Sequence, residues 1–187
     1  MKIGIVWAFS TWKTTLAYQL KEKYERVYWD KIHLDINTER ELAELLSFDF
    51  NKHTEEQKLD YQRWLVHTTL AVAWKYDDLI TDTPINLIPA YCDDENIKKI
   101  VRKYSPYLYD IIFYLPIEFE IENDWVRHTN EELRRGVNKR VLEELHNAYS
   151  QNNKLTIRTL HWSIADRLQQ AIYFIDMWKR SWRWIWF

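Results

Sequence analysis

K-I-G-I-V-W-A-F-S-T-W-K-T-T, residues 2–15, is the stretch that decides the fold. It opens with a short apolar run at residues 2–6, which is typical of a buried strand. It ends with K-T-T at residues 13–15, where helical periodicity begins. A phosphate-binding loop has the pattern G-x-x-x-x-G-K-[ST] between a strand and a helix. The spacing, the lysine and the hydroxyl residue match this pattern, but Trp7 and Trp12 stand at both glycine positions.

A loop of this kind binds phosphate through its main chain and two of its side chains. Its N–H groups, together with the start of the following helix, surround the phosphate oxygens of a nucleotide. Lys13 would bring its charge to the β- and γ-phosphates, and the Thr14 hydroxyl would be a ligand of Mg²⁺. We therefore predict ATP and Mg²⁺ as cofactors. The predicted cofactor-binding residues of the loop are Trp7, Ala8, Phe9, Ser10, Thr11, Trp12, Lys13, Thr14 and Thr15.

Outward from this stretch, apolar runs alternate with segments of helical periodicity. Strands are expected at residues 2–6, 27–28 or 33–36, 79–81, 111–115 and 155–157. Helices are expected at residues 14–24, 38–46, about 54–74, 94–104, 130–149 and 163–177, with N-caps at Thr38, Thr54 and Ser163. Strands joined by helices predict a three-layer α/β fold, with a parallel sheet of about five strands and helices on both faces. We expect residues 1–187 to form one domain, because no linker or repeat divides them.

Composition narrows the classes of partner. The net charge of -2 gives no electrostatic basis for nucleic-acid binding. A single cysteine, Cys92, fits a reducing compartment, and no apolar run approaches the roughly 18 residues of a membrane-spanning helix. We therefore expect a cytoplasmic protein whose partners are ATP and a small molecule. The basic, Trp-rich tail at 178–187 fits either an interfacial membrane contact or an ordinary chain end, and the sequence does not indicate an oligomeric state.

Two features would complete a phosphoryl-transfer site. The apolar run L-I-T-D ends at Asp82, where a carboxylate would contact Mg²⁺ or position the acceptor hydroxyl, although aspartate is also common in turns. Residues 121–140 are polar and rich in arginine, and they would form a lid over the phosphates. Arg127 is the lid residue expected to act on the transferred group. The predicted catalytic residues are Lys13, Asp82 and Arg127, and the predicted metal ligands are Thr14 and Asp82.

Other charged residues near these motifs fit two interpretations. Arg134 and Arg140 suit a lid, and they suit equally well a solvated helix face on which glutamates lie at helical spacing. Glu39 and Arg40 follow the second strand region, where groups that read the phosphate acceptor are usual. The same two residues also suit the first turn of an ordinary helix.

The order of the motifs resembles the NadR-type AAA/P-loop kinase family, which includes ribosylnicotinamide kinase domains. The matching stretches are I-G-I-V-W-A-F-S-T-W-K-T-T-L-A at 3–17, T-E-R-E-L at 38–42, E-E-Q-K at 55–58, L-I-T-D-T at 79–83 with A-Y at 90–91, Y-D-I-I-F-Y-L-P at 109–116, N-D-W-V-R at 123–127 and H-W-S-I-A-D-R-L at 161–168. The resemblance spans residues 1 to about 175. It implies phosphoryl transfer from ATP to a small nucleoside-like acceptor, a lid at about 121–140, and Arg167 near the adenine or the phosphates.

The departures from that family are all of one kind. Trp stands at residues 7, 12, 125 and 162, where the family has Gly. Two Gly and 11 Trp together equal an ordinary Gly complement, which for this length is about 13 residues. Trp64 suits a helix, but the other tryptophans are expected at turns, element ends or the tail, where Gly is natural. These are Trp29, Trp74, Trp178, Trp182, Trp184 and Trp186.

Three explanations for these tryptophans remain open. Non-Gly residues in the left-handed region cost roughly 1–2 kcal/mol, and an indole at residue 12 would crowd the phosphates, so the chain as written is expected to bind ATP poorly. First, UGA codons that the natural host reads as Gly have been read as Trp. Second, the protein is a pseudo-kinase that kept the fold as a binding or scaffold protein. Third, it is a Trp-rich interaction module, although the scatter of its tryptophans argues against a single binding face.

Overall fold

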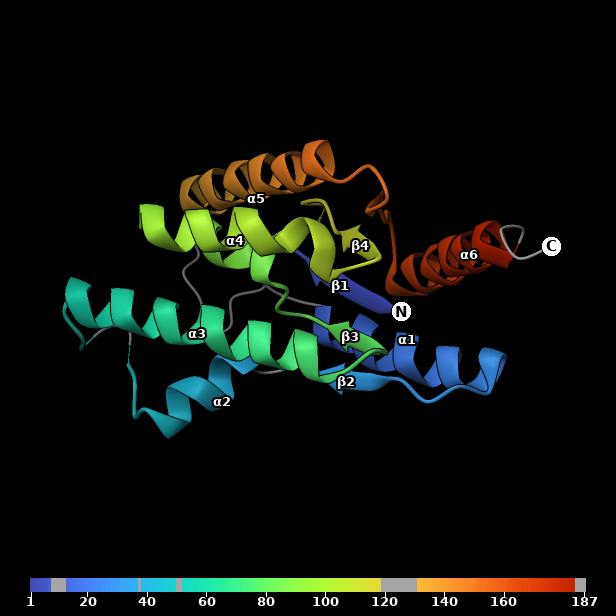
Figure 1. Cartoon of the computed structure of the whole chain (residues 1–187), viewed down its shortest axis with the longest axis horizontal. Helices are drawn as coiled ribbons and strands as arrows, with labels where there is room; N and C mark the ends of the chain where they lie inside the picture. The colour runs from blue at the N-terminus through green and yellow to red at the C-terminus, as the bar shows by residue number, and fades with distance from the viewer. Residues whose placement is uncertain (8–12, 37, 50–51, 119–130, 184–187) are drawn as a thin grey trace.

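Five parallel strands form one sheet in the order β2-β3-β1-β4-β5 (Figure 1). The computed structural model describes residues 1–7, 13–36, 38–49, 52–118 and 131–183, and the side chains up to residue 181. The strands are β1 (Lys2–Val6), β2 (His33–Asp35), β3 (Leu79–Thr81), β4 (Ile111–Tyr114) and β5 (Thr156–Thr159). The predicted α/β fold with a five-stranded parallel sheet is thereby confirmed.

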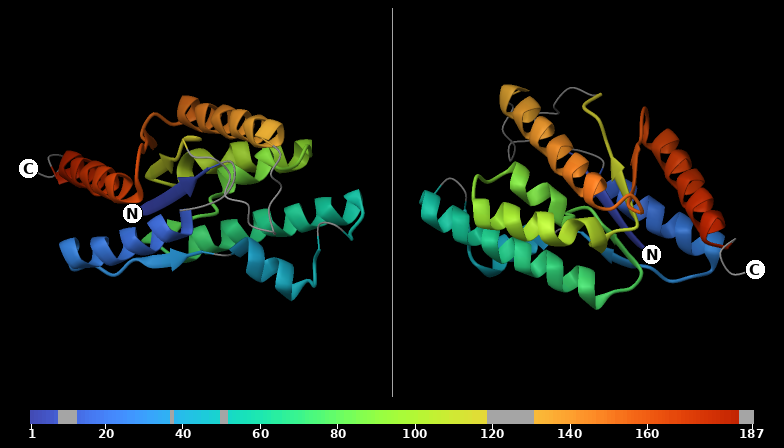
Figure 2. Two further views of the ribbon diagram at one scale, coloured as in Figure 1. Left: turned by 180° about the vertical axis from the view of Figure 1, so that it is seen from behind. Right: turned by 45° about the horizontal axis from the view of Figure 1, so that its top comes forward.

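Helices cover both faces of the sheet. They are α1 (Lys13–Tyr28), α2 (Thr38–Leu45), α3 (Glu55–Lys75), the 3₁₀ helix η1 (Ile85–Ala90), α4 (Glu95–Leu108), α5 (Glu131–Gln151) and α6 (Ile164–Arg183). The helices α1 and α6 pack together on one face, and α3, α4 and α5 lie on the other (Figure 2). This arrangement gives the three layers that alternating strands and helices predict.

Local sequence signals account for several element boundaries. The Thr54 hydroxyl accepts the Gln57 backbone N–H at 3.3 Å, and the Gln57 side chain accepts the Thr54 N–H at 2.9 Å, which forms the expected capping box. The Ser163 hydroxyl accepts the Asp166 N–H at 3.3 Å before α6, as predicted. Thr38 was predicted as the N-cap, but the structure makes it the first residue of α2, and its hydroxyl donates to the carboxylate of Asp35.

The structure also resolves the choice between the two candidates for the second strand. Residues 27–28 belong to α1, and β2 is His33–Asp35. The short 3₁₀ helix η1 was not expected, because it follows Pro84 and contains Pro89, which reads in sequence as a turn. Pro84 also comes close to β1. A Cβ built on Gly4 would lie 3.0 Å from the Pro84 Cβ, so the absence of a side chain at Gly4 permits this contact.

The strands β1, β3 and β4 form the centre of the core. Ile3, Ile5, Ile80, Ile111 and Phe113 have no exposed surface. Burying each such side chain stabilises the fold by about 1.5–3 kcal/mol. Because β1 lies between β3 and β4, the two segments that follow β1 and β3 leave the sheet side by side at its carboxyl edge.

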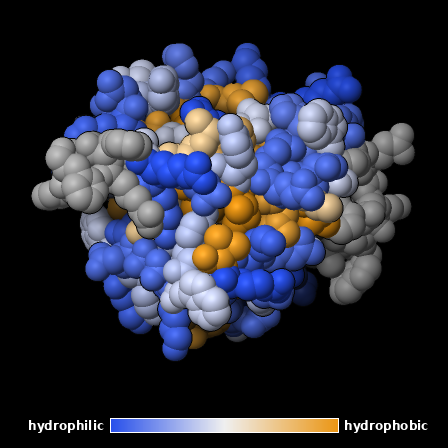
Figure 3. All heavy atoms as spheres, turned by 90° about the vertical axis from the view of Figure 1, so that its right-hand side faces the viewer, coloured by the Kyte–Doolittle hydropathy of each residue, from blue (hydrophilic) through white to orange (hydrophobic). Residues whose placement is uncertain are grey.

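Figure 3 shows one end of the molecule, where most of the visible surface is hydrophilic. The end of the molecule shown in Figure 3 carries apolar patches between polar residues rather than one uniform apolar face. None of the helices within the described residues is long and apolar enough to span a membrane.

Candidate functional site

The carboxyl edge of the sheet brings Thr14 and Asp82 together. Thr14 lies in the first turn of α1, and Asp82 directly follows β3. The Thr14 hydroxyl donates a hydrogen bond of 2.5 Å to Asp82 Oδ2. Asp82 is 5% exposed. These are the two residues that we predicted as metal ligands, and their oxygen atoms are of the kind that Mg²⁺ prefers.

Asp35 joins this edge from the neighbouring strand. It ends β2 and is buried, and its carboxylate accepts the Thr81 hydroxyl at 2.7 Å as well as the Thr38 hydroxyl. Its carbonyl accepts the Asp82 N–H at 3.2 Å. The sequence interpretation missed Asp35, although the signal was present. The run H-L-D is a strand candidate that ends in a carboxylate, as L-I-T-D is at Asp82.

The start of α1 faces this edge of the sheet. Lys13 is the first residue of the helix, and Thr15 is exposed on it. The loop residues between Trp7 and Lys13 lie outside the described part of the chain, so their predicted nucleotide contacts stay predictions. These residues are Ala8, Phe9, Ser10, Thr11 and Trp12.

Trp7 lies directly after β1, and its indole is 1% exposed. Two guanidinium groups lie beside its ring. The Arg167 Cζ is 5.2 Å from the ring centroid and the Arg134 Cζ is 6.0 Å from it. The two arginines are 1% and 2% exposed, respectively. A cation–π contact contributes about 0.5–2 kcal/mol, whereas burying each ion costs several kcal/mol, so the indole does not offset the burial of these two cations.

Glu118 connects the segment after β4 to the start of α6. Its Oε2 accepts the Arg167 Nη2–H at 2.9 Å and the Trp162 backbone N–H at 2.7 Å, and its Oε1 contacts His161 Nδ1. Burial acts to raise the pKa of Glu118, but these three partners outweigh it and hold the pKa below its ordinary value. Glu118 therefore keeps Arg167 in place as an ionised carboxylate.

The sequence left two interpretations open for Arg134 and Arg140, and the structure distinguishes these two residues and their neighbour Arg135. Arg140 Nε donates to the Ala90 carbonyl at 2.7 Å, so it holds η1 against α5. Arg135 is 77% exposed and pairs with Glu131. Arg134 is buried beside Trp7, and its Nη1 lies 3.4 Å from Glu131 Oε2. Of the three, Arg134 alone contacts the segment that begins the predicted phosphate loop.

Other predicted residues are placed elsewhere. Arg127 and the first half of the predicted lid, residues 121–130, lie outside the described residues, and residues 131–140 belong to α5. Glu39 and Arg40 are exposed on the first turn of α2. This position agrees with the interpretation as an ordinary first turn of a helix, and the other interpretation, contact with the acceptor, stays untested.

The tryptophans fall into different structural settings. Trp29 and Trp162 have φ values of 58° and 71°, in the left-handed region that favours Gly. Trp29 is 91% exposed and its N–H bonds to the Glu25 carbonyl at 3.0 Å, which is the arrangement of a glycine that ends a helix. Trp178 is different from what we expected, because it lies inside α6 and packs against the core. Trp74 is in the last turn of α3.

One cavity opens beside Asp35. It has a volume of about 440 Å³ and lies between β2, α2 and α3. Asp35 and Thr38 line one part of it, and Leu42 and Val72 contribute apolar wall. His33 also lines it and stacks on Tyr76 with 3.5 Å between ring centroids. The cavity thus combines a carboxylate with apolar and aromatic surface.

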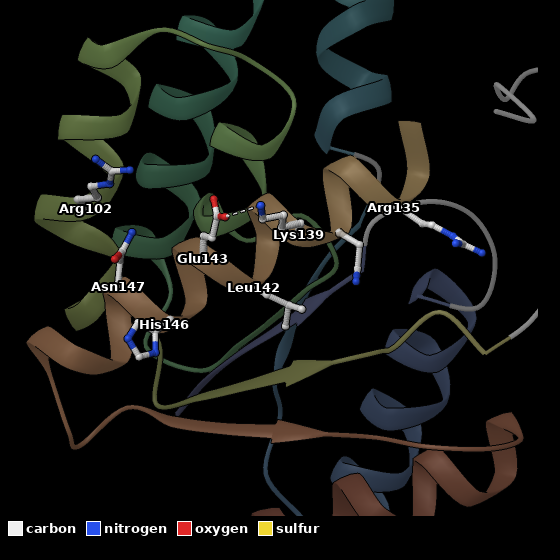
Figure 4. Close-up of a pocket in the computed structure, with 8 residues that line it drawn as sticks. Arg102, Arg135, Lys139, Leu142, Glu143, His146 and Asn147 are labelled. Carbon is white, nitrogen blue, oxygen red and sulfur yellow. Dashed lines mark ion pairs between the residues drawn. The ribbon is translucent and has the colours of Figure 1, made fainter. Parts of the chain in front are cut away.

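A second hollow of about 650 Å³ is lined by residues of α4 and α5, and neither Thr14 nor Asp82 is among them (Figure 4). Two of the cations that line it are already paired. Lys139 lies 4.0 Å from Glu143, and Arg102 pairs with Glu144 at 2.9 Å. We therefore place the candidate site at the carboxyl edge of the sheet and not in this hollow.

Comparison with known proteins shows a likeness of fold. No protein-family model matches the chain, and no curated protein sequence matches it. Among solved structures, shikimate kinase from Aquifex aeolicus is 12% identical, with a TM-score of 0.57 over 94% of this chain and 96% of that chain. Deoxyadenosine kinase from M. mycoides, with dCMP and dCDP bound, is 14% identical, with a TM-score of 0.56 over 95% of this chain and 99% of that chain. The chain has the fold of P-loop kinases.

Proposed function

We propose that this chain is built as an ATP-dependent kinase that transfers a phosphoryl group to a small nucleoside-like metabolite. The proposal concerns the chain with glycine at residues 7 and 12, because tryptophan at either position opposes phosphate binding. The observation that carries it is the hydrogen bond of 2.5 Å between Thr14 and Asp82. It joins the K-T-T motif to the L-I-T-D motif, which the sequence had linked only by their order.

Thr14 and Asp82 would hold Mg²⁺, since a hydroxyl and a carboxylate at one place suit a cation that takes few protein ligands and completes its shell with phosphates and water. When bound, Mg²⁺ would neutralise charge that develops on the phosphates. Lys13, at the start of α1, would place its ammonium on the phosphate oxygens. Arg127 would act from the lid, which stays a prediction from sequence.

Asp35 is the residue we propose for the acceptor hydroxyl. Its carboxylate is fixed by two threonine hydroxyls and lines the cavity between β2, α2 and α3. A carboxylate in that position would orient the hydroxyl and accept its proton during transfer. The apolar wall and the stacked His33–Tyr76 pair support a flat, ring-containing acceptor. The motif resemblance to ribosylnicotinamide kinase domains supports the same class.

One observation favours a second function, that of a pseudo-kinase which kept the fold as a binding or scaffold protein. The Trp7 indole is buried beside Arg134 and Arg167. In the chain as written, this indole therefore occupies the space next to the two arginines. A pseudo-kinase that binds another partner would carry this residue by selection. A misread UGA codon would place it there without function, and the positive φ of Trp29 and Trp162 supports glycine at those two positions.

Titration calorimetry of Mg·ATP tests the proposed function. We expect the chain as written to show no binding, and Trp7→Gly/Trp12→Gly to bind Mg·ATP. Lys13→Ala in that double variant should weaken binding at least about tenfold, equivalent to about 1.4 kcal/mol, while Lys23→Ala on the exposed face of α1 should not. A screen of nucleosides with labelled ATP would then identify the acceptor. Full phosphoryl transfer by the Lys13→Ala variant would reject the assignment, and absence of any ATP binding in the double variant would favour the pseudo-kinase.

A further inference from the structure

Thr81 is the last residue of β3, and its hydroxyl forms two hydrogen bonds of opposite direction. It donates to Asp35 Oδ2 at 2.7 Å and accepts the Thr83 backbone N–H at 3.1 Å. Chemistry fixes both directions, because an ionised carboxylate can only accept and a backbone N–H can only donate. The side chain is 1% exposed. The single hydroxyl proton of Thr81 is therefore committed to Asp35.

These two bonds connect the two sides of the proposed site. Asp35 lines the cavity on the acceptor side, whereas Thr81 does not. On the nucleotide side, the Thr83 hydroxyl donates to Asp82 Oδ1 at 3.2 Å. A second link runs along the main chain, where the Asp82 N–H donates to the Asp35 carbonyl at 3.2 Å. Hydrogen bonds thus run from the Asp35 carboxylate through Thr81 to the segment that carries Asp82.

The two threonines that hold the Asp35 carboxylate belong to different parts of the fold. Thr38 is the first residue of α2, a helix that lines the cavity with several of its residues. Thr81 belongs to β3, which is paired with β2 on one side and β1 on the other. A group that is anchored to a paired strand is held more precisely than one anchored to a less supported segment. Thr81 therefore ties Asp35 to the sheet.

We propose that Thr81 is a positioning residue for phosphoryl transfer, which sets the Asp35 carboxylate relative to Asp82. An acceptor hydroxyl at Asp35 is thereby aligned with the nucleotide held on the Asp82 side. This inference rests on the proposed function and assigns it a residue that touches neither substrate. Displacement of a reacting group by about 1 Å can reduce the rate about 10²-fold. Loss of the Thr81 hydroxyl is thus expected to lower kcat rather than the affinity for nucleotide.

Thr81→Val tests this role in the Trp7→Gly/Trp12→Gly parent, because it replaces the hydroxyl with a methyl group of similar size. The assay uses labelled ATP, and the acceptor is whichever of ribosylnicotinamide and the common ribo- and deoxyribonucleosides the parent phosphorylates fastest. We expect kcat to fall about 10–10²-fold. The affinity for Mg·ADP, measured by calorimetry, should stay the same. Thr81→Ser keeps the hydroxyl and should retain most of kcat.

Thr69→Val is the matched control for loss of a buried threonine hydroxyl. Thr69 lies on α3 and is 2% exposed, and its hydroxyl has no hydrogen-bond partner among the described residues. We expect this variant to keep the kcat of the parent. Hydrogen exchange of the Thr83 amide, followed by NMR, tests the bond itself without catalysis. It should become about tenfold faster in Thr81→Val and stay near the parent rate in Thr81→Ser and Thr69→Val.

The outcomes separate this inference from the proposed function. An unchanged kcat in Thr81→Val, with faster exchange of the Thr83 amide, would overturn the positioning role and leave the proposed function intact. Equal impairment of Thr81→Ser and the parent lacking the hydroxyl would overturn it too, and Thr81→Ser gives this answer even if Thr81→Val fails to fold. A loss of Mg·ADP affinity as large as the loss of kcat would place Thr81 on the nucleotide side and also overturn it. A parent that phosphorylates no nucleoside would reject the proposed function, and with it any role of Thr81 in transfer.

Discussion

Thr14 and Asp82 are 68 residues apart in sequence, and the Thr14 hydroxyl donates a 2.5 Å hydrogen bond to the Asp82 carboxylate. Asp82 is 5% exposed, so loss of this donor leaves a buried charge with one partner fewer. We predict that Thr14→Val lowers the free energy of unfolding by about 1–3 kcal/mol. Urea denaturation of the chain as written would measure this. Thr14→Ser keeps the hydroxyl and should lose less than half as much, and an unchanged stability of Thr14→Val would contradict the bond.

Trp29 has a left-handed backbone and an indole that is 91% exposed. We predict that Trp29→Gly stabilises the chain by up to about 1 kcal/mol, because relief of roughly 1–2 kcal/mol of backbone strain exceeds the entropy cost of glycine. Trp29→Ala removes the indole but keeps the Cβ, and should give no such gain. Denaturant unfolding of both variants measures the difference.

Trp64 is the matched control for the glycine argument. It is 60% exposed but lies in the interior of α3, where its backbone is helical. Trp64→Gly should therefore destabilise the chain by about 0.5 kcal/mol or more, because glycine is the poorer helix former. If glycine raises the free energy of unfolding at residue 29 and lowers it at residue 64, the backbone favours glycine at the first position and not at the second. Destabilisation at both would argue that the tryptophan at residue 29 is native.

The sequence predicted those features of the fold that depend on local patterns of residues, such as apolar runs and helix caps. Apolar runs predicted β1 and β3 with the observed bounds, and the Thr54 capping box was found as expected. Long-range relations were out of reach of such patterns. The meeting of Arg134 and Arg167 at Trp7 depends on how α5 and α6 pack, and their spacing along the chain carries no sign of it.

Residues at the ends of helices and strands were harder to predict from sequence, for the same physical reason. Asp35 reads as a strand residue followed by a helix, and only its pairing with Thr81 on β3 brings it to the edge beside Asp82. From sequence, Trp178 was expected at a turn, an element end or the tail, where glycine is natural, but the structure places it inside α6. The backbone angle of Trp29, by contrast, agrees with the glycine inferred from composition and turn position.

Glu118 gives a pH dependence whose sign is fixed by its lowered pKa. A carboxylate whose pKa is lower in the folded state stabilises the fold above its ordinary pKa of 4.5, and this contribution is lost as the pH falls through the folded value. We predict that Glu118→Gln lowers the free energy of unfolding by about 1–2 kcal/mol at neutral pH. The difference from the parent should shrink as the pH falls below the ordinary value.

Urea denaturation at several pH values, from neutral into the acid range, would measure this dependence. Glu44→Gln is the control, because Glu44 is exposed on α2. A constant difference between Glu118→Gln and the parent over the whole range would show that the ionised carboxylate is not what binds Arg167.

In the proposed reaction, Asp35 belongs to the acceptor side of the site, and Thr14 and Asp82 belong to the nucleotide side. Its carboxylate is held by Thr38 and Thr81 and faces the cavity beside β2, whereas Thr14 bonds to Asp82. In the Trp7→Gly/Trp12→Gly chain with the acceptor found by screening, Asp35→Asn should reduce kcat by about 10²–10⁴, the range for a lost general base. Mg·ATP affinity should change little, because the amide keeps one oxygen to accept one threonine hydroxyl and its NH₂ group can donate to the other. Asp30→Asn, on the exposed turn before β2, is the control and should leave both quantities unchanged. If Asp35→Asn retains kcat but loses affinity for Mg·ATP, Asp35 belongs to the metal side of the site, and the proton of the acceptor must go elsewhere.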